Sequence, residues 1–165
     1  YEVYWTMTAD QLFTRMHKEY QRFWNEERLT KAKKLGLTPT EVATIASIIA
    51  SETNKKDEYP IIASIYLNRL KKGIALQACP TVIYAVGDFS IRRVLKRRLA
   101  IDSPYNTYKN KGLTPGPICN PGIKSIIGAA NPSTHSYLFY HTDESKKDGS
   151  HIFTETFSQH LSTMN

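Results

Sequence analysis

A stretch in the second half of the chain, DSPYNTYKNKGLTPGPICNPG at positions 102–122, excludes regular secondary structure over its whole length. It holds four of the chain's eight prolines and three of its eight glycines, together with several asparagines. Proline lacks a backbone donor, and glycine and asparagine favour turns, so neither a helix nor a central strand can continue through it. We expect an extended loop, and loops of this length inside a compact domain are usually functional.

The sequence before this loop is dominated by helical periodicity. In TADQLFTRMHKEYQRFWNEERLTKAKK, apolar residues recur at helical spacing, which predicts one long amphipathic helix from Thr8 to about Lys34 with Thr8 as its cap. Gly36 then interrupts the pattern.

Two further helices follow. LTPTEVATIASIIASET predicts the first, with Thr38 as N-cap, Pro39 at the first helical position and Glu41 completing a capping box. YPIIASIYLNRLKKG predicts the second, which ends at Gly73. Within the first of them, ATIASIIASETNKK at positions 43–56 has the apolar face that is typical of a buried helix.

The signals after Gly73 are shorter. PTVIYAV fits either a strand or a helix, and the pattern leaves the choice open. SIRRVLKRRL sets arginines and lysines opposite an apolar stripe, which predicts an amphipathic helix with a solvated basic face. GIKSIIGAANP predicts a helix of small residues, SYLFYHT and HIFTE predict two strands around the turn DESKKDGS, and TFSQHLSTMN predicts a terminal helix.

This order of elements indicates the α+β class, because helices come first and a hairpin follows. We expect a helical N-terminal half packed with a small antiparallel sheet, and the long loop rich in Tyr, Asn, Pro and Gly forming a cleft. The length of 165 residues suits a single domain, residues 1–165.

The chain carries 22 Lys and Arg against 15 Asp and Glu, and its net charge of +7 favours an anionic partner such as nucleic acid, a lipid surface or an acidic polymer. Because no zinc-finger spacing, phosphate-binding loop or RNA-binding aromatic signature accompanies the charge, we do not expect nucleic acid. The five histidines form neither HxxxH nor HExxH, so we expect no metal and no cofactor. No apolar run is long enough to cross a membrane.

One carboxylate falls on the apolar face of the helix predicted for LTPTEVATIASIIASET. With 100° of rotation per residue, Ile48, Ile49 and Glu52 all project within roughly 60° of Ile45. A carboxyl group in such surroundings loses hydration, so its pKa rises toward the range that a general acid needs. The alternative is that the helix frays at Ser51 and Glu52 points into water.

Two loops could supply binding groups. The long loop concentrates Tyr and Asn, whose flat rings and hydrogen-bonding tips suit sugars, although both residues also simply favour turns. Gln77 and Thr81 would add polar groups if their segment approached the long loop. The two cysteines, Cys79 and Cys119, lack the CxxC spacing and are either two thiols or one disulfide.

Several of these segments together resemble the endolytic murein transglycosylases, the YceG-like or MltG family. The resemblance rests on IASIIASET, NRL at 68–70, LQACPTVIYA at 76–85, the whole of 102–122, AANP at 129–132, and HIF with the following His160. It runs from about Gly36 to His160, and residues 1–35 resemble only a helical lead-in to the family's catalytic domain.

The resemblance implies a catalytic residue and a reaction. The family's essential glutamate falls on Glu52. Family members often have EKET at this point, whereas this chain has ASET, so the first of the two acids is absent and Glu52 remains as the candidate. The implied enzyme is a lytic transglycosylase that cleaves between N-acetylmuramic acid and N-acetylglucosamine in nascent peptidoglycan strands. Glu52 would act first as acid and then as base, leaving 1,6-anhydro ends.

The resemblance also assigns supporting residues. Tyr105, Asn106 and Thr107 would hold the glycan, and Gln77, Thr81 and Asn120 would line the groove. Cysteine replaces the family's usual residue at both 79 and 119, which suggests that Cys79 and Cys119 pair.

The resemblance further implies a cellular setting. The enzyme would be anchored in the cytoplasmic membrane by one helix N-terminal to this sequence, with its catalytic domain on the periplasmic or extracytoplasmic side. Peptidoglycan strands would be its substrate and peptidoglycan synthases, the penicillin-binding proteins, its partners. Two alternatives are a non-catalytic peptidoglycan-binding module, which needs no buried acid, and a glycan hydrolase, which needs a second carboxylate such as Asp102 near Glu52.

Overall fold

The structure is a computed structural model that describes residues 2–164, and it consists of two compact units, Tyr1–Pro39 and Thr40–Asn165. Within the described residues, no helix has both the length and the apolar character of a membrane span.

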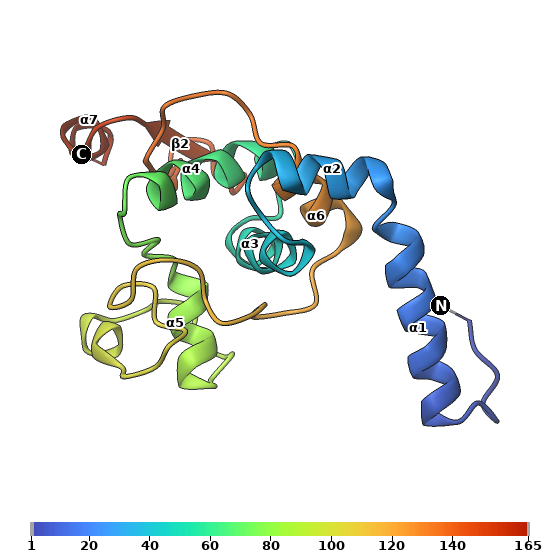
Figure 1. Cartoon of the computed structure of the whole chain (residues 1–165). Coiled ribbons are helices and arrows are strands. Elements are labelled where there is room, and N and C mark those ends of the chain that lie inside the picture. The colour runs from blue at the N-terminus through green and yellow to red at the C-terminus, as the bar shows by residue number, and fades with distance from the viewer. Residues whose placement is uncertain (1, 165) are drawn as a thin grey trace. The chain divides into compact units, whose positions relative to one another are not determined.

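The first unit contains α1 (Ala9–Phe23) and α2 (Glu26–Lys34), drawn in blue in Figure 1. The predicted cap at Thr8 is confirmed. Its hydroxyl accepts a hydrogen bond from the Gln11 backbone at 3.3 Å, and the Gln11 side chain accepts one from the Thr8 backbone at 2.9 Å. These reciprocal bonds satisfy two amides at the helix start.

The prediction of one continuous helix from Thr8 to Lys34 is wrong. Helix α1 ends at Phe23, and the side chain of Asn25 accepts a hydrogen bond from the Arg28 backbone at 3.0 Å to start α2. An asparagine side chain competes with the backbone carbonyls for helical amides, so it favours a cap over a helix interior. The apolar periodicity continues across this break and therefore conceals it.

The core of the second unit is built on α3 (Pro39–Glu52) and α4 (Tyr59–Lys71), which confirms both predicted helices. In Figure 1, α3 is seen end-on and α4 runs across above it. These two helices contribute a set of aliphatic side chains that are all 0% exposed: Val42, Ile45, Ile48, Ile49, Ile62 and Ile65.

The segment left open between strand and helix is helical, as α5 (Cys79–Val86). The amphipathic helix predicted for SIRRVLKRRL is wrong, because only a short 3₁₀ helix, η1 (Lys96–Ala100), forms there. Leu95, which belongs to the predicted apolar stripe, is 46% exposed. Without a buried face, a basic segment of this length gains too little from packing to hold an α-helix.

The long loop at 102–122 contains no helix or strand, as predicted, and it is held by side-chain bonds instead. The Asn106 amide donates to the carbonyls of Leu99 and Ile101 at 2.9 and 2.8 Å, while its oxygen accepts from the Tyr108 backbone at 3.0 Å. Farther along, the Ile118 amide donates to the Ser47 hydroxyl at 3.0 Å, which fixes the loop to α3.

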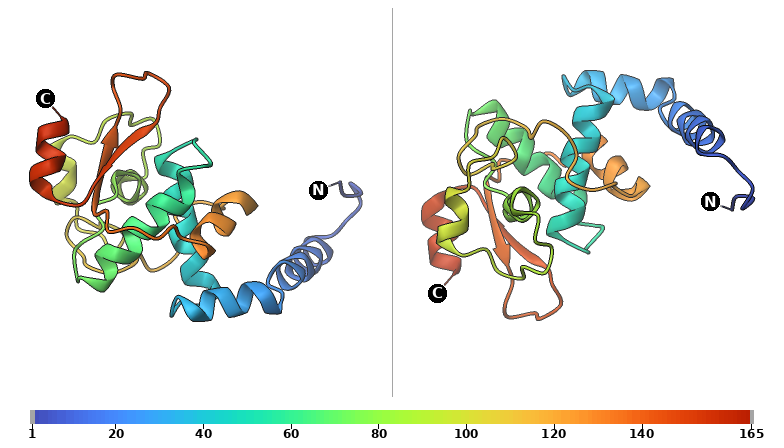
Figure 2. Two further views of the ribbon diagram at one scale, coloured as in Figure 1. Left: turned by 90° about the horizontal axis from the view of Figure 1, so that it is seen from above. Right: turned by 90° about the horizontal axis from the view of Figure 1, so that it is seen from below.

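The C-terminal part consists of α6 (Ile123–Ala130), the strands β1 (Phe139–Thr142) and β2 (His151–Thr154), and α7 (Phe157–Thr163). The strands pair antiparallel, with Tyr140 opposite Phe153 and Thr142 opposite His151. Figure 2 shows this hairpin in orange-red beside α7. These elements confirm the predicted hairpin, the predicted helices around it and the α+β class.

Helices α4 and α6 approach so closely that one glycine is required between them. A Cβ atom at Gly128 would lie 2.6 Å from the Cβ of Tyr59 and 3.4 Å from its backbone carbonyl carbon. We expect Gly128→Ala to lower the free energy of unfolding by about 1–3 kcal/mol, because the helices must separate to admit a methyl group. Urea unfolding followed by circular dichroism measures this change.

Gly122→Ser is the matched control for this prediction. Gly122 caps α6 with φ of −68°, and no atom lies within 4 Å of the place that a Cβ would occupy, so a side chain fits there. Serine is also a favoured N-cap residue. Equal stability of Gly128→Ala and the unmodified chain would contradict the close contact.

Candidate active site

Glu52 is the last residue of α3 and is half-buried, so its side chain does not fray into water. The Tyr66 hydroxyl, from α4, donates to the Glu52 carboxyl at 3.3 Å and lies 2.8 Å from the Tyr140 hydroxyl of β1. Two consecutive helices and a strand that is distant in sequence therefore meet at one carboxyl group. This supports the sequence-based placement of Glu52 on the protected face of its helix.

Burial sets the protonation behaviour of this group. Loss of hydration raises the pKa of Glu52 to about 7, although hydrogen bonds from Tyr140 and Tyr66 favour the carboxylate and act in the opposite direction. Burial also raises the pKa of both tyrosines well above the usual value, so their hydroxyls remain neutral donors. At neutral pH the carboxyl group is thus present in both its acid and its base forms.

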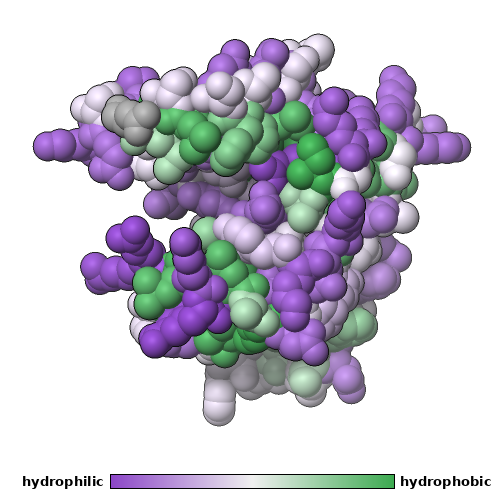
Figure 3. Space-filling model, turned by 90° about the vertical axis from the view of Figure 1, so that its left-hand side faces the viewer, coloured by the Kyte–Doolittle hydropathy of each residue, from purple (hydrophilic) through white to green (hydrophobic). Residues whose placement is uncertain are grey.

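Glu52 lines a cavity of about 420 Å³. Figure 3 shows the corresponding face of the molecule, which is hollowed between an upper and a lower layer of side chains with apolar surface on both. The walls combine aromatic rings, imidazoles, one guanidinium and, among the described residues, one carboxylate, that of Glu52. The other lining residues are Arg69, Leu76, Gln77, Cys79, Tyr108, Leu138, Phe139, Tyr140, His141, Thr142, His151, Phe157 and His160.

Arg69 connects the walls of this cavity. Its guanidinium donates to the carbonyls of Leu138 at 2.7 Å and Leu76 at 2.9 Å, and to the Gln77 side chain at 3.2 Å. The buried Arg69 guanidinium of α4 thereby holds in place both Leu138, which directly precedes β1, and the 75–77 segment. Bonds of a charged donor to carbonyls are among the stronger ones in proteins.

Gln77 lies where the sequence places it, at the meeting of the two polar segments. Its backbone amide donates to the Thr107 carbonyl at 3.1 Å, and the next amide, that of Ala78, donates to the Thr107 hydroxyl at 3.0 Å. Gln77 adopts φ of 54°, a left-handed conformation that costs a non-glycine residue free energy and persists only where its surroundings enforce it. The contact between the 77–78 segment and Thr107 therefore holds Gln77 in this conformation.

The other five residues predicted to bind substrate lie outside this cavity. Thr81, Asn106 and Thr107 are buried, and Thr81 and Thr107 bond one another at 2.8 Å. The Tyr105 ring packs 4.7 Å from that of Tyr84, and Asn120 is exposed. The buried residues support the loop that carries Tyr108 into the cavity wall, so their visible role is structural.

The two cysteines are free thiols in the structure, which does not contain the disulfide that the resemblance suggested. The Cys79 sulfur lies 3.1 Å from the Tyr108 hydroxyl in the cavity wall. The Cys119 sulfur instead donates to the Ser47 carbonyl at 3.4 Å. Each thiol thus has its own partner in a different part of the unit.

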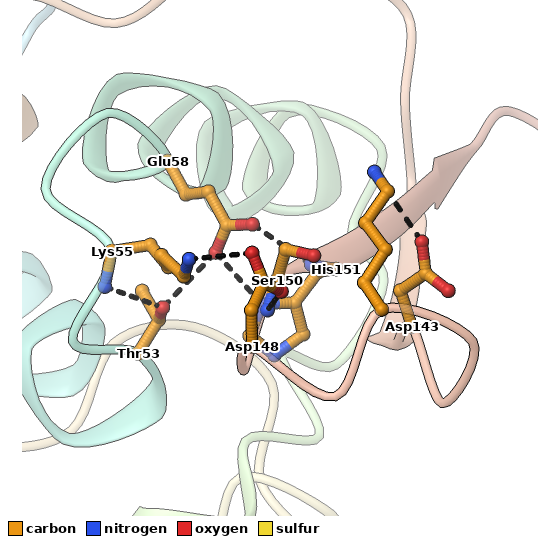
Figure 4. A network of polar contacts seen from close by, with 8 residues as sticks. Thr53, Lys55, Glu58, Asp143, Asp148, Ser150 and His151 are labelled. Carbon is orange, nitrogen blue, oxygen red and sulfur yellow. Dashed lines mark hydrogen bonds and ion pairs between the residues drawn. The ribbon is translucent and has the colours of Figure 1, made fainter.

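A buried acid and histidine form a second pair near Glu52, in the network of Figure 4. Glu58 accepts from the His151 backbone at 2.8 Å, and its other oxygen lies 2.7 Å from His151 Nδ1. Alongside, Lys55 forms an ion pair with Asp148 at 2.7 Å. These contacts tie the start of β2 to the segment between α3 and α4.

A second cavity of about 390 Å³ lies against this network. It shares Glu52, Thr142 and His151 with the first cavity, so the carboxyl group stands between two recesses. In the described part of the chain, no cluster of three or more His, Cys, Asp or Glu side chains could hold a metal ion.

Sequence reasoning missed Tyr66, Arg69, Tyr140, Glu58 and His151. A signal exists for two of them: Tyr66 and Arg69 follow Ile62 at helical spacings of four and seven, so they share its buried face. A polar group on a buried helical face was the same signal that singled out Glu52. The other three depend on contacts between distant segments.

Comparison with known proteins identifies the family to which the chain belongs. The sequence model of the YceG-like family matches residues 1–165. The chain is 44% identical over 131 residues to the endolytic murein transglycosylase of Bacillus subtilis (strain 168), covering 79% of this chain and 35% of that protein. It is 32% identical over 138 residues to the endolytic murein transglycosylase of Streptococcus pneumoniae, covering 81% of this chain and 24% of that protein.

The chain thus spans about a third or less of the length of these curated relatives. A crystal structure of a yceG-like protein from Listeria monocytogenes matches with a TM-score of 0.84 and 34% identity, over 98% of this chain and 51% of that one. Sequence and fold therefore agree along nearly the whole chain. The chain belongs to the YceG-like family.

Proposed function

We propose that this chain carries the catalytic part of an endolytic peptidoglycan transglycosylase, with Glu52 as its catalytic residue. The observation that carries the proposal is the half-buried carboxyl group of Glu52, whose pKa is raised to about 7, in the wall of a cavity of about 420 Å³. The family relatives named endolytic murein transglycosylase support the choice of substrate.

The reaction uses one carboxyl group twice. Neutral Glu52 donates its proton to the glycosidic oxygen as that oxygen leaves C1 of N-acetylmuramic acid. The resulting carboxylate then takes the proton of the same sugar's C6 hydroxyl, whose oxygen bonds to C1. The glycosidic bond is exchanged for an internal 1,6-anhydro bond, and Glu52 regains its proton.

A pKa near neutrality suits this double role, because the group must give up a proton and then regain it. Hydrogen bonding from Tyr66 stabilises the carboxylate that forms midway. Two-carboxylate hydrolases require a second acid across the scissile bond. Among the described residues, the first cavity's wall offers no second carboxylate, and Asp148 in the second cavity is paired with Lys55.

The deciding experiment is mass analysis of uncrosslinked peptidoglycan strands after incubation with the chain. Products lighter by one water than hydrolysis products would support the transglycosylase. Reducing ends would indicate a hydrolase, and no cleavage despite binding would indicate a glycan-binding module.

The pH dependence tests the tyrosine contacts. We expect Tyr140→Phe to shift the pH profile of kcat/KM upward by about one unit, because removing a hydroxyl that favours the carboxylate raises the pKa of Glu52 further. Tyr137→Phe, which alters the same short segment outside the cavity wall, should leave the profile in place. If the pH profile of Tyr140→Phe did not shift, the pKa that this profile reports could not be assigned to Glu52.

The cellular setting extends the proposal. Peptidoglycan lies outside the cytoplasmic membrane, so the catalytic unit would act on the extracytoplasmic side, attached to the membrane and working beside peptidoglycan synthases. Arg92, Arg93, Lys96 and Arg97 are exposed and form no ion pair within residues 2–164, which suits acidic neighbours. Every residue of the two cavities belongs to the second unit, and we assign the activity to the core at 36–165 with 1–35 as its lead-in.

A further inference from the structure

The imidazole of His151 is held more firmly than a structural tie requires. One Glu58 oxygen, Oε2, bonds Nδ1 of the His151 ring, and the other, Oε1, accepts from the His151 backbone amide. The side chains of His151 and Glu58 are only 8% and 6% exposed. The Thr53 hydroxyl donates at 3.0 Å to Glu58 Oε2, the oxygen that also bonds His151 Nδ1. Figure 4 shows Glu58 turned toward His151, with Thr53 on its other side.

This arrangement fixes the orientation of the ring. A carboxylate can only accept, so Nδ1 carries the proton that faces Glu58, and the tautomer that this contact selects has its lone pair on Nε2. A carboxylate behind a histidine sets the tautomer in this way at many functional sites. The protein therefore presents Nε2 as an acceptor in a defined position.

That acceptor has no use within the protein. Nε2 forms no hydrogen bond in the described part of the chain, and it is not among the buried atoms closed off from solvent. The imidazole lines both cavities that contain Glu52. Its unused nitrogen is thus available to a molecule that occupies the space next to the catalytic carboxyl group.

We propose that His151 is a substrate-binding residue whose Nε2 accepts a hydrogen bond from a sugar hydroxyl beside Glu52, with Glu58 as the positioning residue that orients the ring. The ligand class, a glycan, rests on the proposed function. Sugar hydroxyls are the donors that such a substrate has in abundance, and an acceptor that is already fixed in place loses little conformational freedom when they bind.

Two substitutions separate binding from structure. Asparagine places its amide nitrogen near the position of Nδ1, so His151→Asn can keep the bond to Glu58 but has no atom at Nε2. Glutamine reaches the position of Nε2, so His151→Gln can keep a polar atom there but loses the Nδ1 bond. Each variant removes one half of the arrangement.

Binding is measured without cleavage by adding each substitution to Glu52→Gln and titrating uncrosslinked glycan strands by calorimetry. We expect Glu52→Gln/His151→Asn to bind about fivefold to tenfold more weakly than Glu52→Gln, the loss that one net hydrogen bond represents. Glu52→Gln/His151→Gln should keep more of the affinity although it is less stable. In the cleaving protein, His151→Asn should raise KM by a similar factor and change kcat by less than about twofold.

Asp143→Ala is the control for a merely structural role. Asp143 accepts from the Ser145 backbone at 3.1 Å and so stabilises the hairpin turn, but it lines neither cavity that contains Glu52. It should lower thermal stability without raising KM. Equal weakening of binding by Asp143→Ala and His151→Asn would overturn the proposal.

The remaining outcomes are also decisive. Unchanged glycan affinity in Glu52→Gln/His151→Asn, or absence of glycan binding by Glu52→Gln itself, would overturn the role of His151. Binding that depends on His151, in a protein that with Glu52 intact yields no anhydro products, would support the role of His151 and contradict the transglycosylase. Failure of one proposal is therefore distinguishable from failure of the other.

Discussion

Replacing Glu52 with glutamine is expected to lower the rate of glycan cleavage by about 10²–10⁴-fold, the usual contribution of a general acid or base. The amide can neither donate a proton to the glycosidic oxygen nor accept one from the C6 hydroxyl. Its oxygen can still accept the hydrogen bond from Tyr66, so the fold around the site is kept. The measurement is the rate of release of anhydro ends from uncrosslinked strands.

Exposed Glu144 provides the control for this variant. Glu144→Gln makes the same chemical change outside both cavities that contain Glu52, and it should cleave at the unmodified rate. If Glu52→Gln retained more than a tenth of the unmodified rate, another group would have to move the proton, and the single-acid mechanism would be wrong.

The same substitution is expected to stabilise the protein at alkaline pH by on the order of 3 kcal/mol, the energy equivalent of the pKa shift from 4.5 to about 7. The folded protein holds the Glu52 proton more tightly than the unfolded chain, so stability falls as the pH rises from about 4.5 to about 7. Below this window both states are protonated, and the penalty is absent. Above it the penalty is complete, and glutamine avoids it.

Urea unfolding of Glu52→Gln and the unmodified chain at pH 4, pH 6 and pH 8 tests this expectation, with Glu144→Gln again as control. The difference in unfolding free energy should be small at pH 4 and largest at pH 8, since only the unmodified chain has a carboxylate at position 52 whose ionisation destabilises the folded state. A constant difference would mean that Glu52 keeps an ordinary pKa in the folded state. Activity loss together with alkaline stabilisation is the pattern of a group placed for chemistry at the expense of stability.

Local rules predict the parts of this fold in which local and global preferences agree. Helices α3 and α4 are apolar and begin at proline or close to it, and α4 ends near Gly73, so capping and burial give the same answer. The predictions that are wrong are the continuous helix through Asn25 and the amphipathic helix for SIRRVLKRRL. In both cases a helical apolar spacing is present, but a capping side chain or the lack of a packing partner outweighs it.

The site is predicted as far as one helix can predict it. Glu52 is recognisable because a carboxylate on an apolar helical face is unusual within a single element. Tyr140 and His151 come from a hairpin whose position over α3 and α4 no periodicity reveals. The polar residues of the long loop are harder to interpret from sequence, because the bond from Asn106 to the Leu99 carbonyl and the bond from the Ala78 amide to the Thr107 hydroxyl join the loop to segments that no periodicity places beside it.

The contacts that complete the site join distant parts of the chain. Tyr66 meets Tyr140 across 74 residues, and Glu58 meets His151 across 93. Contacts of such separation form late in folding, because the loop they close must first be ordered. During synthesis the α3 and α4 helices emerge long before the hairpin, so a nascent chain contains Glu52 without the walls that raise its pKa. The proposed reactivity of Glu52 would thereby be delayed until β2 has been made.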